Sequence, residues 1–230
     1  FGKYNRDSDV KHFKSLQEKE GNRMQEGIKI RWLGHSCFKV EFMGYSVVFD
    51  PYEDGYVPGL KPLREEADKV LCSHDHGDHN AKKVITERKG GKCPVCVKTI
   101  STWHDDRQGA LRGKNLIHLL EWDSFRIAHL GDLGCQLLPE QEDDLKGLDL
   151  LMVPVGGYYT INARQAKDLV ERICPRVTVP MHYRGENFGF DVLAPLEDYR
   201  NLCDDVVFYE NSEFFLTKDL PKQTAVLKIQ

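Results

Sequence analysis

Apolar and polar residues alternate in short runs along much of the chain, which is the pattern typical of β-strands. Three such runs, at 28–33, 37–42 and 46–49, are separated by glycine-containing turns and predict an antiparallel meander. The same pattern predicts further strands at 69–73, 97–101, 116–122, 125–129, 148–153, 176–181, 206–209 and 225–229.

Helical periodicity is clearest at 162–173, where apolar residues recur every three or four positions and Thr160 or Asn162 can cap the first turn. Shorter helices are predicted at 80–86 and 193–203. A strand-rich chain with occasional helices predicts an α/β (α+β) fold. Residues 1–27 are polar and are expected to form an extension, and residues 28–230 are expected to form one domain.

Composition narrows the class of protein. Hydrophobic residues make up 40% of the 230 residues and charged residues 30%, which is typical of a soluble globular protein. A formal net charge of -4 without a dense basic run argues against a nucleic-acid partner, and no apolar stretch is long enough to span a membrane. Seven scattered cysteines favour reduced thiols and a cytoplasmic location, although the start at Phe1 leaves an exported form open.

The candidate chemistry begins directly after the run at 69–73, in the sequence H-D-H-G-D-H at 74–79. His74 and His76 lie two apart in an extended segment, so their imidazoles can bind one ion at roughly 2.0–2.1 Å. Asp78 and His79 are adjacent in the sequence, so their side chains point away from each other. Because these four side chains do not close comfortably around one tetrahedral ion, the sequence predicts two metal ions.

The segment 74–79 resembles the signature of the metallo-β-lactamase superfamily, and W-L-G-H-S at 32–36 and V-P-V-G-G at 153–157 strengthen this likeness. Together they resemble the branch that includes ascorbate-6-phosphate lactonase and the N-acylphosphatidylethanolamine phospholipase D enzymes. The likeness covers residues 28–185 and implies the four-layer αββα sandwich of the metallo-β-lactamase fold.

The resemblance also implies a complete set of metal ligands. His104 matches the third imidazole of a first ion, beside His74 and His76, and Asp132 matches a carboxylate that bridges both ions. His182 matches the last ligand of a second ion. The implied ligands are therefore His74, His76, Asp78, His79, His104, Asp132 and His182.

Other residues are expected around this set. Asp50 matches a carboxylate that orients a ligating histidine, and His35 is expected near the site without being a ligand. Tyr159 and Arg184 are candidate substrate contacts. Arg184 shares with Arg107, Arg112 and Lys114 a place in loops that follow ligand strands, which indicates either an anionic substrate or ordinary surface charge. His12, His118 and His129 are expected to lie outside the site, and the C-x-x-C at 93–96 is expected to be two ordinary thiols.

The resemblance implies a metal-dependent hydrolase. Its attacking group would be a hydroxide held between two divalent ions, with zinc the first candidate and manganese or iron the others. Asp78 and Asp132 are the candidate catalytic carboxylates, with Tyr159 a further candidate for the leaving-group proton. The expected substrate is a small ester, lactone or phosphodiester that can be anionic. Two alternatives stay open: an iron-dependent oxidoreductase and a non-catalytic metal-binding protein.

Overall fold

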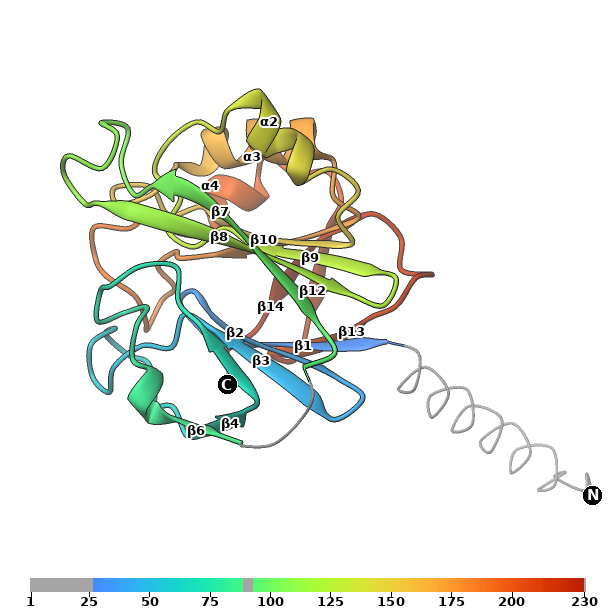
Figure 1. Cartoon of the computed structure of the whole chain (residues 1–230). Coiled ribbons are helices and arrows are strands. Elements are labelled where there is room, and N and C mark those ends of the chain that lie inside the picture. Colours follow the sequence, from blue (N-terminus) through green and yellow to red (C-terminus); the bar gives the residue numbers. More distant parts are fainter. Residues whose placement is uncertain (1–26, 89–92, 230) are drawn as a thin grey trace, which may run out of the picture.

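Two β-sheets packed face to face form the centre of the computed structural model, which describes residues 27–88 and 93–229 (Figure 1). The first sheet has five strands in the order β13-β1-β2-β3-β5. These strands are β1 (Ile28–Gly34), β2 (Cys37–Phe42), β3 (Tyr45–Phe49), β5 (Lys69–Leu71) and β13 (Glu213–Leu216). The predicted antiparallel meander β1-β2-β3 is confirmed, since β2 pairs antiparallel with both neighbours.

The second sheet has seven strands in the order β12-β14-β11-β10-β9-β8-β7. They are β7 (Cys96–Trp103), β8 (Lys114–Trp122), β9 (Phe125–His129), β10 (Leu150–Pro154), β11 (Val177–Met181), β12 (Val206–Tyr209) and β14 (Gln223–Leu227). The central strands β10 and β11 are buried at every position, which agrees with their largely apolar sequences; Thr178 in β11 is the one polar residue. Apolar side chains of both sheets form one large hydrophobic cluster between them.

Helices cover the outer face of the seven-stranded sheet (Figure 1). They are α2 (Pro139–Asp144), α3 (Ala163–Ile173) and α4 (Glu197–Arg200). The helix predicted at 162–173 is confirmed as α3. The Asn162 side chain accepts a hydrogen bond from the Gln165 backbone, and the Gln165 side chain accepts one from the Asn162 backbone.

The outer face of the five-stranded sheet is covered differently. A second apolar cluster, which includes Val48, Leu63 and Ile85, packs there beneath a two-stranded ribbon of β4 (Glu65–Ala67) and β6 (Ile85–Glu87). The 3-10 helix η1 (Lys82–Val84) precedes β6. Within residues 27–88 and 93–229, this second outer layer therefore contains a ribbon and η1 in place of α-helices. The mixed α/β arrangement agrees with the expected fold class.

Two predicted helices are wrong in extent. The segment 80–86 forms only η1 and then enters β6, because the β-branched Ile85 pairs alongside Glu65 and is buried in the second apolar cluster. The helix predicted at 193–203 is reduced to α4 (Glu197–Arg200). Before it, the Ala194 backbone N–H donates to Gly156 and its carbonyl accepts from Arg184, so this stretch is bonded to loops instead of to itself.

The remaining expectations concern segments without predicted chemistry. Residues 1–26 of the expected polar extension lie outside the described residues. No helix of the described part is long and apolar enough to cross a membrane. Cys93 and Cys96 are exposed free thiols at the start of β7, and the Cys93 thiol donates to the Val95 carbonyl.

Candidate metal centre

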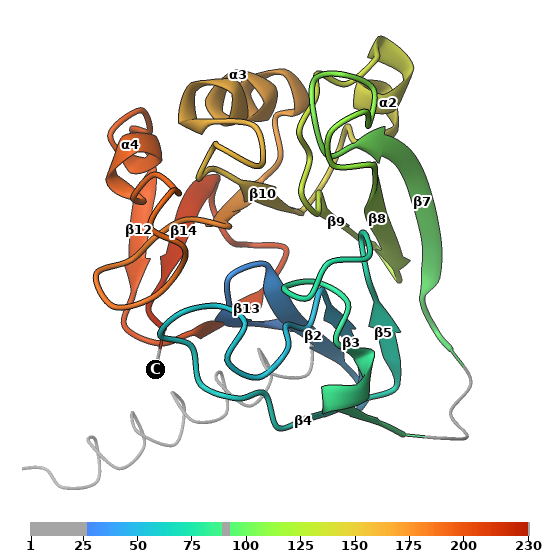
Figure 2. The ribbon, with the colours of Figure 1, turned by 90° about the vertical axis from the view of Figure 1, so that its left-hand side faces the viewer.

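The predicted ligands lie where strands of both sheets end. The turn 74–79 follows β5 of the first sheet, whereas His104, Asp132 and His182 follow β7, β9 and β11 of the second. The loops after these strands gather on the left-hand side of Figure 1 and face the viewer in Figure 2. The structure thus brings side chains from four separate stretches to one end of the sandwich.

Asp132 lies at the centre of the histidines. Its Oδ2 atom is 3.1 Å from His182 Nε2, 3.2 Å from His79 Nε2, 3.5 Å from His104 Nε2 and 3.9 Å from His74 Nε2. Burial alone raises the pKa of Asp132, but the neighbouring His182 and His79 outweigh it and hold this pKa well below its usual range. Asp132 is therefore an ionised carboxylate in contact with four imidazoles.

A tight turn places Asp132 there. Gly131 has φ +56, and a Cβ atom at this position would lie 2.4 Å from both Asn115 Oδ1 and Ser73 Cβ. Asn115, buried in β8, accepts a hydrogen bond from the Asp132 backbone at 2.9 Å and donates to Thr102 Oγ1 and the Leu130 carbonyl. A fully bonded Asn115 thus fixes the backbone of the central carboxylate.

Two clusters of possible metal-binding atoms adjoin Asp132. In the first, His74, His76 and His104 each offer a ring nitrogen within 4.8 Å of the other two. His74 and His79 form a further such group with Asp132. His76 is exposed, so the first cluster faces solvent on that side.

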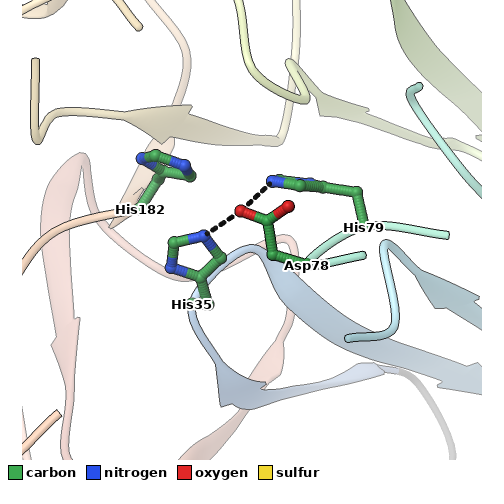
Figure 3. Close-up of side chains that lie close together, drawn as sticks. All are labelled: His35, Asp78, His79 and His182. Atoms are coloured by element: carbon green, nitrogen blue, oxygen red, sulfur yellow. Dashed lines mark hydrogen bonds and ion pairs between the residues drawn. The ribbon is translucent and has the colours of Figure 1, made fainter. Parts of the chain in front are cut away.

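The second cluster contains His35, Asp78, His79 and His182, whose ligand atoms also lie within 4.8 Å of one another (Figure 3). Asp78 Oδ2 is 3.3 Å from His35 Nε2 and 3.5 Å from His79 Nε2, and the His35 and His182 rings lie 4.1 Å apart. Burial lowers the pKa of His35 to about 4, so its imidazole is neutral. His35 is thus close enough to be a ligand itself, a role that the sequence did not indicate.

Asp50 is hydrogen-bonded to one of the histidines directly and to a second through Ser73. Its Oδ2 atom accepts from His79 Nδ1 at 2.8 Å and from Ser73 Oγ at 2.6 Å, and Ser73 Oγ lies 2.9 Å from His74 Nδ1. Since the Ser73 hydroxyl donates to Asp50, His74 Nδ1 donates to that hydroxyl. Both rings therefore direct Nε2 towards Asp132, and that of His74 is unprotonated. Burial alone lowers the pKa of His79, but the carboxylates of Asp132 and Asp78 outweigh it and raise this pKa well above its usual value.

His129, which was expected to lie outside the site, packs behind it. The Gly131 backbone N–H donates to His129 Nδ1, so His129 Nε2 carries the proton and donates to the Ser36 carbonyl at 2.8 Å. The ring stacks on Phe49 at 4.9 Å, and its Nδ1 lies 4.0 Å from Asp50 Oδ2. His129 supports the turn before Asp132, but its ring nitrogens are both used.

Unpartnered polar atoms show that this donor set fits metal ions. Among the described residues, His74 Nε2, His79 Nε2, His182 Nε2 and Asp132 Oδ1 are buried without a hydrogen-bond partner. Asp50, Asp78 and Asp132 also carry pKa values that their histidine neighbours hold low against the effect of burial. Buried carboxylates need compensating positive charge, and imidazole and carboxylate donors are ligands that zinc, manganese and iron accept.

The two candidate substrate contacts lie in different surroundings. Tyr159 is half-buried, 6.4 Å from the Phe190 ring, which in turn lies 5.6 Å from His35. The Arg184 guanidinium donates to the Leu193 carbonyl and lines a hollow with Trp32 and Phe188. Sequence reasoning missed Asn115 and Ser73 as supporting residues. The sequence held no signal for Asn115, and the signal for Ser73 was its position directly before His74.

Comparison with known proteins identifies the superfamily. A model of the beta-lactamase superfamily domain matches residues 29–182, a range that contains all seven predicted ligands. The chain belongs to the metallo-β-lactamase superfamily, as the sequence predicted. The branch with ascorbate-6-phosphate lactonase stays a prediction.

Similar proteins carry a more specific description. A UPF0173 metal-dependent hydrolase of Thermococcus onnurineus is 29% identical over 213 residues, which span 77% of this chain and 93% of the relative. A UPF0173 protein of Pyrococcus abyssi is 32% identical and is matched over 83% of its length, with 68% of this chain covered. A solved structure from Thermotoga maritima, provisionally described as a Zn-dependent hydrolase of this superfamily, has 31% identity and a TM-score of 0.70; the match covers 88% of this chain and 100% of that one.

Proposed function

We propose that this chain is a metal-dependent hydrolase that binds two divalent ions at the ends of β5, β7, β9 and β11. The observation that carries the proposal is the position of Asp132 Oδ2, within 3.9 Å of four imidazole Nε2 atoms from three separate loops. The similarity to UPF0173 metal-dependent hydrolases supports the same activity.

The proposed ligands divide between two positions. His74, His76 and His104 would hold one ion and Asp78, His79 and His182 the other, with Asp132 placed to reach both. His35 lies close enough to the second group to add a ligand or to orient Asp78. The nitrogen-rich donor set makes zinc the first candidate, with manganese and iron as the others.

Bound divalent ions would lower the pKa of a shared water towards neutrality and polarise a carbonyl or phosphoryl oxygen of the substrate. The chain positions the reacting groups. Asp132 Oδ1 is buried without a partner among the described residues, so it can accept a hydrogen bond from the attacking water. Asp78, or the half-buried Tyr159, can carry the proton of the leaving group.

The proposed substrate is a small ester, lactone or phosphodiester. A formal net charge of -4 argues against a nucleic-acid substrate. All seven cysteines lie in the described part and are free thiols, which supports the proposal of a cytoplasmic protein.

Metal analysis and a substrate screen test this function. The native protein is expected to retain about two metal ions per chain after dialysis and to hydrolyse at least one ester, lactone, thioester or phosphodiester. Asp132→Ala should lower kcat/KM by at least about a thousandfold. Asp143→Ala, at an exposed ion pair on α2, is the control and should match the native protein.

The screen can also contradict the proposal. Full metal occupancy without turnover of any substrate class would favour a metal-binding protein, and bound iron with oxygen-dependent turnover would favour an oxidoreductase. Hydrolysis that persists in Asp132→Ala would show that it comes from a contaminant or from another site.

A further inference from the structure

Three aromatic side chains lie in a row beside the metal centre: Tyr56, Phe190 and Tyr159, here called the aromatic row. The Phe190 ring contacts Tyr56 at 6.3 Å and Tyr159 at 6.4 Å, both nearly edge to face. Phe190 also lies 5.6 Å from the ring of His35. The row therefore connects three loops that are far apart in the sequence and reaches the cluster around Asp78.

One end of the row packs on the turn that carries four of the proposed ligands. A Cβ atom at Gly77 would lie 2.4 Å from Tyr56 Cε2, so the Tyr56 ring covers the backbone of this glycine. Tyr56 nevertheless remains 47% exposed. An apolar surface therefore begins directly beside His76 and Asp78 and remains open to solvent.

The other end of the row carries a positive charge. The Arg112 guanidinium carbon lies 5.4 Å from the centre of the Tyr159 ring, in cation–π geometry. Arg112 belongs to the loop that follows His104, so it approaches from the side of the first ligand cluster. Among the described residues, this guanidinium makes no hydrogen bond or ion pair with another side chain.

The loop that presents Arg112 is held by one carboxylate. Asp105, itself buried, accepts hydrogen bonds from the backbone N–H groups of Arg107, Gly109, Leu111 and Arg112, at 2.7–3.0 Å. These four bonds lower the pKa of Asp105 to about 2. The position of Arg112 over Tyr159 is therefore built into the loop through the backbone and does not depend on a side-chain ion pair.

The exposed ring of Tyr158 extends the row. It lies 4.7 Å from the Tyr159 ring, nearly edge to face, and Tyr158 is 65% exposed. A contiguous exposed apolar surface is typical of a binding site.

From this arrangement we propose that the substrate carries a flat apolar group, which packs on the aromatic row, and a negative charge, which Arg112 binds. The proposal rests on the function proposed above and narrows its substrate to an amphipathic anion, such as an aryl-substituted acid or diester. It also assigns the anion-binding role to Arg112 in place of Arg184, whose guanidinium is bonded to the Leu193 carbonyl in a different hollow.

A binding experiment tests the row without requiring turnover. The probes are naphthalene-2-sulfonate, the uncharged 2-(methylsulfonyl)naphthalene and methanesulfonate, each titrated into the metal-loaded protein and followed by NMR. We expect naphthalene-2-sulfonate to bind about tenfold more tightly than either of the other two, because only it supplies both the ring and the charge.

Variants then locate the binding site. Arg112→Gln should weaken naphthalene-2-sulfonate about tenfold and leave the uncharged sulfone unchanged, whereas Tyr159→Ala should weaken both. Arg107→Gln is the matched control on the same loop. Arg107 is exposed, and what it has in common with Arg112 is a backbone hydrogen bond to Asp105. Phe208→Ala is the control for the ring, since Phe208 is also exposed with an arginine over it, on β12.

The results separate this inference from the function on which it rests. Binding that depends on Arg112 in a protein without hydrolytic activity would support the proposed role of the aromatic row and Arg112 and would contradict the proposed function. Equal affinities of Arg112→Gln and Arg107→Gln for naphthalene-2-sulfonate, or no preference for this anion, would contradict the proposed binding of an aromatic anion even if the protein hydrolyses esters. Retained near-ultraviolet circular dichroism in each variant shows that the fold is intact.

Discussion

Asp50 is not one of the proposed metal ligands, yet two imidazoles depend on it. It accepts from His79 Nδ1 and, through the Ser73 hydroxyl, sets the proton position on His74. Asp50 has φ +42, and its backbone N–H is bonded to the Leu71 carbonyl, so the end of β3 is fixed next to the end of β5. A strained backbone of this kind is maintained only where its surroundings hold it.

Asp50→Asn should therefore lower metal affinity by about 10–100-fold while the chain remains folded. The amide cannot accept from both His79 and Ser73 through the same charged oxygen, so the two rings lose their fixed orientation. Competition with a chromogenic chelator measures the change. Asp54→Asn, at an exposed ion pair with Arg64, is the control, and an equal loss of affinity in both variants would contradict this role for Asp50.

At this scale the sequence predicted the chemical groups but not all of their supports. The candidate ligands at 74–79 could be recognised because five of these six residues are histidine or aspartate, whereas His104, Asp132 and His182 were implied only by the resemblance. That these residues bind metal stays a prediction. Asn115 and Asp105 could not be recognised, because a polar residue in or beside a strand has many ordinary explanations. Their partners become apparent only when β8 lies beside the turn at Gly131 and when the loop after His104 closes.

At the scale of elements, an ion cluster ties the strands together at the end of the sheet away from the proposed metals. Asp149, buried just before β10, accepts from the Arg126 backbone, the Arg176 guanidinium and the Lys218 ammonium. These groups belong to β9, to the residue directly before β11 and to the turn after β13. Despite the opposing effect of burial, the three donors lower the pKa of Asp149.

Because the folded pKa of Asp149 is lowered, its carboxylate stabilises the fold above the usual aspartate pKa of about 4, and this contribution is lost as pH falls through the folded value. Asp149→Asn should cost about 2 kcal/mol of unfolding free energy at pH 7 and clearly less at pH 3. Urea unfolding at the two pH values measures it. Asp143→Asn, at an exposed pair, should change stability by less than about 0.5 kcal/mol at either pH.

Long strands and the capped helix α3 were predictable because their periodicity extends over many residues. The failures are short elements. β4, β6 and η1 contain three residues each, too few for a period to emerge, and they exist because the second apolar cluster buries Ile85 and Ala67. The stretch before α4 is likewise decided by bonds to Gly156 and Arg184, which are distant in the sequence.

For the whole molecule, the proposed metal centre joins the two sheets. The turn 74–79 follows a strand of the five-stranded sheet, and the other ligands follow strands of the seven-stranded sheet. One hydrophobic cluster also spans both sheets. We therefore propose that residues 28–230 form one domain whose folding is coupled to metal binding.

Removal of the metals should accordingly lower the thermal midpoint without dividing the transition in two. A free metal concentration a thousandfold above Kd stabilises the native state by about 4 kcal/mol, which corresponds to roughly 8–16 °C in a chain of this size. Differential scanning calorimetry with and without a chelator measures the shift. Two separate transitions in the metal-free protein would contradict the single domain.

The loop held by Asp105 has a consequence for how the proposed substrate preference of this protein could change. The Asp105 carboxylate accepts hydrogen bonds from four backbone N–H groups that lie within seven residues of it. The loop conformation is therefore held by the loop's own atoms and needs few contacts with the rest of the molecule. The sequence at the tip of such a loop can be changed, in evolution or in the laboratory, while the strand ends that carry the proposed metal ligands stay as they are.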